Sequence, residues 1–410
     1  MNQAITARTP FTGYQKFVIA LLAFLQFTII LDFMILSPLG AILMPALKIT
    51  TAQFGTVVSA YAISAALSGF LTAGFADKFD RKQLLLFFYV GFMVGTLLCA
   101  LAPTYELLLG ARIVTGLFGG VIGSIVFAIM TDLFPMQQRG RVMGFLQTAF
   151  AASQVLGLPA GLFLSNLWGW HMPFLMIVLV SLLAGLAIVF YLKPIRDHLE
   201  LQTDKKAYEH LLHTVRVPSY LFAFVATGLL SLGGFMIMPF STAFTVNNLG
   251  IPAGELPLIY FVTGIASILI GPLVGRMSDS YGKYKVFVFG SFVSIVMVLI
   301  YTHLGVTPLY MVMLVNTVMF VGIFSRMIPS QALMSAIPSA ASRGAFMSVS
   351  SSLQSLAGGI GSIVAGAIVV QGSAGEILHF DVIGYVISAI ALVCMVMMYY
   401  INRSVARATG

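Results

Sequence analysis

Two residues of opposite charge lie inside long apolar segments of the sequence. Asp32 interrupts the run FTIILDFMILSPLG, and Arg112 interrupts the run GARIVTGLFGG. A carboxylate removed from water tends to take up a proton, whereas a nearby guanidinium keeps it charged. If the two side chains meet, a change in the distance between them would let Asp32 gain or lose a proton. We therefore predict that Asp32 and Arg112 form a proton-coupling pair; the alternative is a purely structural pair.

Six further polar residues in apolar segments are candidates for binding a small molecule. A side-chain amide or a guanidinium in such a segment needs a hydrogen-bond partner, which a ligand or a neighbouring helix can supply. The candidates are Gln26, Gln147, Gln154, Asn316, Arg326 and Gln354. No histidine has the spacing of a metal ligand, and the two cysteines lie in apolar runs. The sequence therefore predicts neither a metal site nor a cofactor.

The composition predicts the elements that position these residues. Of the 410 residues, 59% are apolar and 8% are charged, whereas soluble domains carry roughly 25% charged residues. The apolar residues form twelve runs, and a helix of about 20 residues crosses the hydrocarbon layer of a membrane. The expected helices are 17–42, 54–76, 83–102, 106–133, 142–166, 172–192, 220–246, 255–277, 286–304, 308–336, 344–370 and 380–401. The predicted fold class is an all-α membrane protein with twelve transmembrane helices.

The lysines and arginines indicate how the chain is oriented. Eighteen of the 21 fall at the membrane side that holds both termini, which is the pattern of cytoplasmic loops. We expect both termini to be cytoplasmic and the protein to lie in the inner membrane of a bacterium. The net charge of +8 then reflects topology rather than nucleic-acid binding. Counting residues from the ends of the runs places Asp32 and Arg112 at similar depth, in the outer half of the bilayer.

The two halves of the sequence repeat each other. AGFADKFDRK begins at Ala73 and GRMSDSYGKY begins at Gly275, an offset of 202 residues. RGRVMG and RGAFMS match at a similar offset, and the segment 193–219 between the halves is the only long charged stretch. We predict a first six-helix bundle in residues 1–192, a cytoplasmic linker in 193–219 and a second six-helix bundle in 220–410. Such a repeat places a substrate site between two pseudo-symmetric bundles.

The loop after the second helix of each half carries a recognisable motif. AGFADKFDRKQL and GRMSDSYGKYK resemble the motif Gly-x-x-Ala/Ser-Asp-Arg-x-Gly-Arg-Lys of the major facilitator superfamily, and the resemblance extends over essentially the whole chain. The first copy departs from it at Ala73, Lys78 and Asp80. The resemblance implies that charges at these loops and at the end of the fourth helix hold the bundles together at the cytoplasmic face; the alternative is that they serve topology alone. The implied gating residues are Asp77, Lys78, Arg81, Asp132, Asp279 and Lys283.

Features of the fourth to sixth helices resemble the twelve-helix drug/proton antiporters of that superfamily. The fourth helix carries an Arg-x-x-x-Gly sequence at Arg112, and the sixth begins with WGWHMPFLM. Small residues recur at every fourth position of the fifth helix, at Ala149, Ser153, Gly157 and Gly161, which lets helices approach closely. The resemblance implies a monomeric secondary transporter that exports amphipathic or drug-like compounds in exchange for protons.

Two other classes of function stay open at this point. A symporter or uniporter for a sugar, an organic anion or a lipid-like solute is the first alternative. A membrane enzyme that transports nothing is the second, but it requires a nucleophile–base set or a metal site inside the bilayer, and the sequence has neither. The expected partners are the lipid bilayer, a small-molecule substrate and protons, with no nucleic acid.

Overall fold

A computed structural model describes residues 11–72, 78–196, 199, 217–338 and 343–409. In this part of the chain, twelve helices are long and apolar enough to cross a membrane. The first half contains α1 Gly13–Ile35, α2 Gly40–Leu47, α3 Thr51–Thr72, α4 Arg81–Leu101, α5 Tyr105–Leu133, α6 Met136–Ala152, the π-helical turn η2 Ser153–Gly157, α7 Leu158–Trp168 and α8 Met172–Tyr191. The second half contains α10 Pro218–Asn247, α11 Leu256–Tyr281, α12 Lys283–Thr302, α13 Leu309–Ser335, α14 Arg343–Ile368 and α15 Phe380–Thr409. The predicted all-α fold of twelve transmembrane helices is confirmed.

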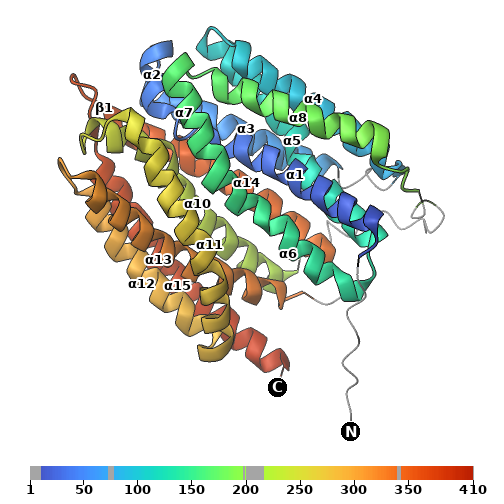
Figure 1. Cartoon of the computed structure of the whole chain (residues 1–410). Coiled ribbons are helices and arrows are strands. Elements are labelled where there is room, and N and C mark those ends of the chain that lie inside the picture. Colours follow the sequence, from blue (N-terminus) through green and yellow to red (C-terminus); the bar gives the residue numbers. More distant parts are fainter. Residues whose placement is uncertain (1–10, 73–77, 197–198, 200–216, 339–342, 410) are drawn as a thin grey trace.

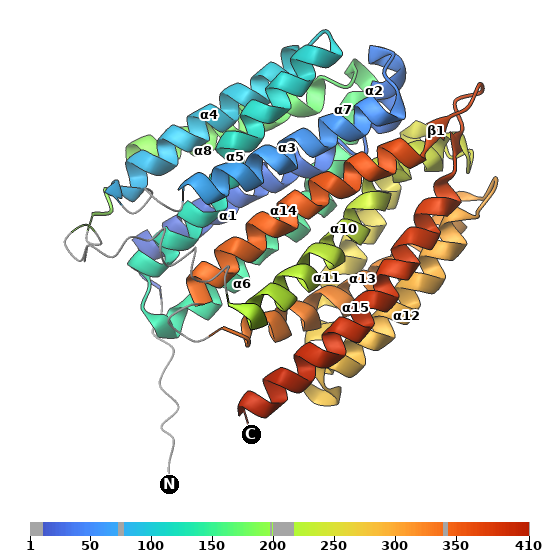
Figure 2. The same cartoon turned by 180° about the vertical axis from the view of Figure 1, so that it is seen from behind.

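The helices form two bundles that lie side by side along one long interface (Figure 1). α1 to α8 make the first bundle, and α10 to α15 make the second. The start of α1 and the end of α15 lie at the same end of the molecule, which we call the terminal face. Helix α2 and the hairpin of β1 Val370–Gln371 and β2 Ile377–Leu378 lie at the opposite end, which we call the far face (Figure 2).

The first transmembrane helix is shorter than predicted. We expected it over 17–42, but α1 ends at Ile35, and α2 follows as a separate helix on the far face. Pro38 lies in the turn between them. Proline lacks the backbone N–H that would continue the helix, and its ring disfavours a helical conformation at the residue before it. The chain therefore turns at this point rather than continuing to residue 42.

The fifth helix is built from three parts, and its small-residue stripe packs against α1. A Cβ added to Gly157 would lie 2.6 Å from Leu31 Cδ1, and one added to Gly161 would lie 2.7 Å from Ile35 Cδ1. Ser153 Oγ donates to the backbone carbonyl of Phe27, 3.1 Å away. The stripe therefore allows the close approach within the first bundle that the sequence predicted.

Two pairs of helices join the bundles. α3 packs along α14, where a Cβ on Gly55 would lie 2.6 Å from the Ser362 carbonyl oxygen. α7 and η2 pack against α11, where a Cβ on Gly264 would lie 2.7 Å from Val155 Cγ2. The repeat relates these two pairs, because the second and fifth helices of one half meet the fifth and second helices of the other. The bundle interface is thus pseudo-symmetric, as predicted from the offset of the motifs.

Hydrogen bonds across the interface strengthen the contact at the far face. Thr51 Oγ1 donates to the Val369 carbonyl oxygen at 2.7 Å, and Asn166 Nδ2 donates to the Ala253 carbonyl oxygen at 3.1 Å. All four residues lie at or near the far-face ends of their segments. These bonds tie the two bundles together on that side of the molecule.

Candidate functional site

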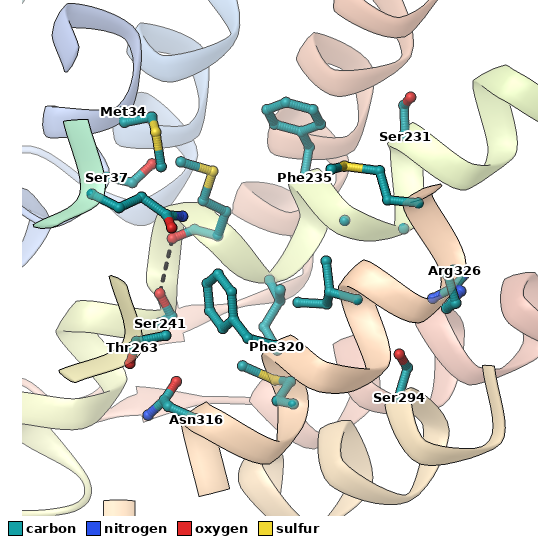
Figure 3. Close-up of a pocket in the computed structure, with 18 of the residues that line it drawn as sticks. Met34, Ser37, Ser231, Phe235, Ser241, Thr263, Ser294, Asn316, Phe320 and Arg326 are labelled. Carbon is teal, nitrogen blue, oxygen red and sulfur yellow. Dashed lines mark hydrogen bonds between the residues drawn. The ribbon is translucent and has the colours of Figure 1, made fainter. Parts of the chain in front are cut away.

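A cavity of about 430 Å³ lies between the two bundles (Figure 3). The first bundle contributes residues of α1, of the turn after it and of the fifth helix, including Met34, Ser37 and Gln154. The second bundle contributes most of the lining, from α10 to α14, and α15 adds one residue, Ile387. Cavities that bind small molecules in proteins have volumes in this range and mostly apolar walls with a few polar groups.

Four of the six predicted ligand-binding residues line this cavity. Gln154 lies on η2, Asn316 and Arg326 lie on α13, and Gln354 lies on α14. Asn316 already donates to the Val312 carbonyl oxygen at 3.0 Å within its own helix. The sequence therefore located four residues of the polar lining, and their role in binding stays a prediction.

The other two predicted ligand-binding residues do not extend this lining. Gln26 is half-buried on α1 and lies near Gly123 of α5, inside the first bundle. It is absent from the cavity wall. Gln147 lies on α6, and its side chain is outside the described residues.

Several polar atoms in the cavity wall are buried without a hydrogen-bond partner in the described part of the chain. They are Gln154 Oε1, Thr227 Oγ1, Ser294 Oγ, Arg326 Nε and Ser350 Oγ. Buried polar groups in native proteins nearly always have a partner, because leaving one unpaired costs about 1–3 kcal/mol. Unpaired groups facing one cavity are therefore positioned to receive a bound molecule or water.

Asp32 and Arg112 form a sealed ion pair inside the first bundle. Arg112 Nη1 lies 2.8 Å from Asp32 Oδ2, and the two side chains are 1% and 0% exposed. Thr96 Oγ1 of α4 donates to Asp32 Oδ1 at 3.1 Å. The guanidinium carbon of Arg112 lies 4.6 Å from the ring centre of Tyr61 on α3. The pairing predicted from helix depth is present, but neither residue lines the central cavity.

A chain of aromatic contacts connects the ion pair to the bundle interface. Phe33 follows Asp32 in the sequence, and its ring centre lies 5.3 Å from that of Tyr61. The same Phe33 ring lies 5.6 Å from Phe235 on α10, which belongs to the second bundle and lines the cavity. Phe235 of α10 thus contacts Arg112 only indirectly, through Phe33 and Tyr61.

Four of the predicted gating residues form two ion pairs, each within one half. Arg81 Nε at the start of α4 lies 3.0 Å from Asp132 Oδ2 near the end of α5. Lys283 Nζ lies 3.8 Å from Asp279 Oδ1 on the surface of the second half. Lys78 is exposed, and Asp77 lies outside the described residues. Three of the ion pairs among the described residues join two residues of the same half, and a fourth joins Asp80 to Arg196 at the start of the linker segment.

Asp80, which the sequence marked only as a departure from the motif, organises the terminal face of the first bundle. Its Oδ1 accepts from the backbone N–H of Lys82 at 2.8 Å, which caps α4. Its Oδ2 lies 2.7 Å from Arg196 Nε, beyond the end of α8. Burial raises the pKa of Asp80, but hydrogen bonds from Arg196, Ile195 and Lys82 outweigh burial and hold the pKa below its ordinary value.

The sequence reasoning missed the neutral residues that complete both sites. Thr96 and Tyr61 contact the ion pair, and Thr227, Ser294 and Ser350 face the cavity with unpaired hydroxyls. Serine, threonine and tyrosine are common in apolar helices, so their presence alone carries no signal. Only the packing of the helices shows which of them face a charge or a cavity.

Comparisons with known proteins agree with this architecture. A sequence model of the Major Facilitator Superfamily matches residues 22–325 and 223–409. The uncharacterised MFS-type transporter YceJ of Bacillus subtilis is 28% identical over 268 residues, covering 65% of this chain and 67% of that protein. Multidrug resistance protein 3 of the same organism is 30% identical over 152 residues, covering 37% of this chain and 30% of that protein. The chloramphenicol efflux pump Rv0191 of Mycobacterium tuberculosis is 25% identical over 294 residues, covering 70% of this chain and 68% of that protein.

Solved structures share the fold at low sequence identity. A bacterial homologue of the human lysosomal transporter Spinster, in an inward-facing and unoccupied conformation, is 16% identical, covers 97% of this chain and 99% of its own, and gives a TM-score of 0.74. The nucleoside transporter NupG is also 16% identical and gives a TM-score of 0.74. The match covers 94% of this chain and 99% of the NupG chain. At this identity the likeness concerns the fold alone.

Proposed function

Because the chain belongs to the major facilitator superfamily, and is thus a multi-pass membrane transporter rather than an enzyme, we propose that it exports small amphipathic compounds in exchange for protons. The observation that carries the proposal is the sealed ion pair of Asp32 and Arg112 beside the bundle interface. A charged pair inside a membrane bundle is costly, and such residues mark proton and substrate pathways. Export is supported by similarity to relatives named multidrug resistance protein 3 and chloramphenicol efflux pump.

In the proposed mechanism, the ion pair responds to the movement of the bundles. Phe33 and Tyr61 link Arg112 to Phe235 of the second bundle. When α10 moves against α1, this aromatic packing changes, and Arg112 moves relative to Asp32. A carboxylate that loses its cationic partner in a dry site takes up a proton, and it releases the proton when the partner returns. Protonation of Asp32 and the access state of the cavity would then depend on each other.

The access state of this structure follows from the contacts between α11 and the fifth helix. Gly264 is packed against Val155, whereas no atom of the described residues lies within 4 Å of a Cβ added to Gly271 or Gly275. The three glycines share one face of α11, because they are seven and four residues apart. The cavity lining also reaches Met334, near the terminal-face end of α13. On the α11 side the bundles thus part toward the terminal face, whereas α3 and α14 stay in contact near it, where a Cβ on Gly69 would lie 3.1 Å from Ser352 Oγ. With cytoplasmic termini, we interpret the parting on the α11 side as an inward-facing state.

A second candidate is a symporter or uniporter for an organic anion or another polar solute. The observation in its favour is Arg326, a cation in the cavity wall. The two candidates differ in what Asp32 does. Exchange for protons requires Asp32 to change its protonation state, whereas a uniporter needs the Asp32–Arg112 pair only for packing.

Transport in proteoliposomes tests the proposal. Purified protein is reconstituted, and uptake of radiolabelled amphipathic compounds, chloramphenicol among them, is measured with and without an imposed pH gradient. We expect the gradient to drive uptake by the wild-type protein and Asp32→Asn to abolish that gradient-driven part. Asp32→Asn protein must elute as a single species, so that loss of folding is excluded. Full gradient-driven uptake by this variant would remove Asp32 as the proton carrier.

A further inference from the structure

We infer that the substrate is an amphipathic organic anion whose acidic group binds Arg326; this inference rests on the proposed transport function and names its substrate class. Arg326 is the only residue with a charged side chain among the described residues that line the cavity. No aspartate, glutamate, lysine or histidine accompanies it in that lining. The cavity between the bundles therefore carries one net positive charge.

The charge of Arg326 is not neutralised by the described part of the protein. Its guanidinium makes no hydrogen bond and no ion pair with the described residues, and its Nε is buried. Arg112, which is fully buried, is held by Asp32 and does not line the cavity. Arg326 is half-buried, with its Nε fully buried. A cation in a mostly apolar wall is costly without a partner, and we infer that the partner is a ligand.

Hydroxyl groups without a partner among the described residues share the cavity wall with Arg326. Ser294 of α12 lies on the same side of the cavity as Arg326, and its Oγ is buried and unpaired (Figure 3). Thr227 of α10 and Ser350 of α14 provide further unpaired hydroxyls in the terminal half of the same bundle. A guanidinium presents a planar fork of N–H donors that matches a carboxylate or phosphate, and hydroxyls can donate to the remaining oxygens.

The rest of the cavity fits an apolar body rather than a second polar group. Met34 and Phe235 border it on the side of the first bundle, and Phe320 lies between them and Asn316 (Figure 3). Ile323 and Met319, on the same helix as Arg326, add further apolar surface. A molecule with an aromatic or aliphatic body and one acidic group would therefore fill the cavity and pair its only charge.

The internal sequence repeat pairs Arg326 with an uncharged residue, so the first half has no arginine at the matching position. At the offset of 204 residues, its counterpart in the first half is Ile122, which is fully buried in the core of the first bundle. The charge therefore does not stem from the internal symmetry of the fold. It introduces an asymmetry into the cavity that binding of an anion explains.

Three probes with the same body and different charge test the inference. They are 4-(1-naphthyl)butanoate, its primary amide and 4-(1-naphthyl)butylamine, and their binding is measured by titration calorimetry on protein in nanodiscs. We expect wild-type protein to bind the butanoate about tenfold or more tightly than the amide or the amine. Arg326→Gln should remove this preference, and Arg326→Lys should retain part of it. Arg403→Gln, which removes an exposed charge from α15 outside the cavity, should leave it unchanged.

The thermal unfolding midpoint separates a binding role from a structural one. Removing this half-buried charge, which has no partner among the described residues, should leave the unfolding midpoint of Arg326→Gln unchanged or raise it. Residues kept for function at a cost in stability behave in this way. A lower midpoint together with retained butanoate preference assigns Arg326 a structural role and overturns the inference. Preference of wild-type protein for the amine, or failure of all three probes to bind, overturns it as well.

Failure of this inference differs from failure of the proposed function. Binding is measured without a gradient, so it does not depend on Asp32. If Asp32→Asn keeps both gradient-driven uptake and the butanoate preference, proton coupling through Asp32 is wrong and the substrate class stands. If Arg326→Gln keeps the preference while Asp32→Asn abolishes gradient-driven uptake, the substrate class is wrong and the coupling stands.

Discussion

Replacing Gly55 with alanine should open the far face of the transporter. A Cβ at this position would lie 2.6 Å from the Ser362 carbonyl oxygen and 3.2 Å from Gly366 Cα on α14. Both are backbone atoms, so α3 and α14 must separate to accommodate the methyl group. Overpacking of this kind costs about 1–3 kcal/mol. Because the contact exists only while the far face is closed, the ratio of closed to open molecules should fall by roughly 5- to 150-fold.

Electron–electron distance measurements between spin labels report this change. Labels at Lys48 and Val306, which are exposed on the far face in different bundles, are introduced after the buried Cys99 and Cys394 have been replaced by alanine. Gly55→Ala should add a population at longer distance that is absent or smaller in the parent protein.

Gly271→Ala is the matched control for this experiment. It makes the same substitution within a transmembrane helix, but among the described residues no atom lies within 4 Å of an added Cβ. The gain in helix propensity is therefore shared, while the clash is not. Identical distance distributions for Gly55→Ala and Gly271→Ala would refute the reasoning. So would a lower unfolding midpoint of Gly55→Ala with unchanged distances, because the contact would then be structural in every access state.

Three further predictions concern the charges. Asp32→Asn and Arg112→Gln should each lower the free energy of unfolding in detergent by about 3–5 kcal/mol, because each leaves one buried polar group without its partner. The double variant should lower it by about 1–3 kcal/mol less than the two single variants together. Additive effects of the two substitutions would contradict a stabilising pair. Cysteines at Lys205 and Lys48 should react differently with an impermeant reagent in intact cells, with labelling at Lys48 only; the reverse pattern would overturn the cytoplasmic placement of the termini. The pKa of Asp80 lies below its ordinary value of 3.8, so the stabilisation by the Asp80 carboxylate should be complete above about pH 4 and should disappear as the pH falls through the lower pKa of the folded state. The difference in unfolding midpoint between wild type and Asp80→Asn should therefore vanish in acid. A difference that grows in acid would contradict the assignment.

The fold was predictable because the length of an apolar run decides whether a helix crosses the membrane. All twelve helices lie where the runs predicted them. Their ends agree within about four residues, except at the end of the first helix, the start of the fifth and the end of the last, which extends to Thr409 rather than 401. The turn at Pro38, the π-helical turn that begins at Ser153 and the hairpin at Val370 were not predicted. The turn at Pro38 carries a local signal, because proline interrupts helices. The other two depend on how neighbouring helices pack, which hydropathy does not record.

Only the site residues that stand out by their charge or by their depth along a helix could be predicted from the sequence. Similar depth was enough to bring Asp32 and Arg112 together, and the cost of a buried charge was enough to single out Arg326. Depth does not record which way a side chain points around its helix. The sequence therefore placed Gln26 beside a ligand, although it lies within the first bundle, and it gave no reason to select Tyr61.

The dependence of the access state on pH tests the central claim most directly, because it needs no knowledge of the substrate. Distances between spin labels at Lys48 and Val306 are measured over a range of pH in the wild-type protein and in Asp32→Asn. If Asp32 carries the proton, the ratio of closed to open far faces should change with pH in the wild type and should be independent of pH in Asp32→Asn. An equal pH dependence in both proteins would contradict the account, because the proton that switches access would then bind elsewhere.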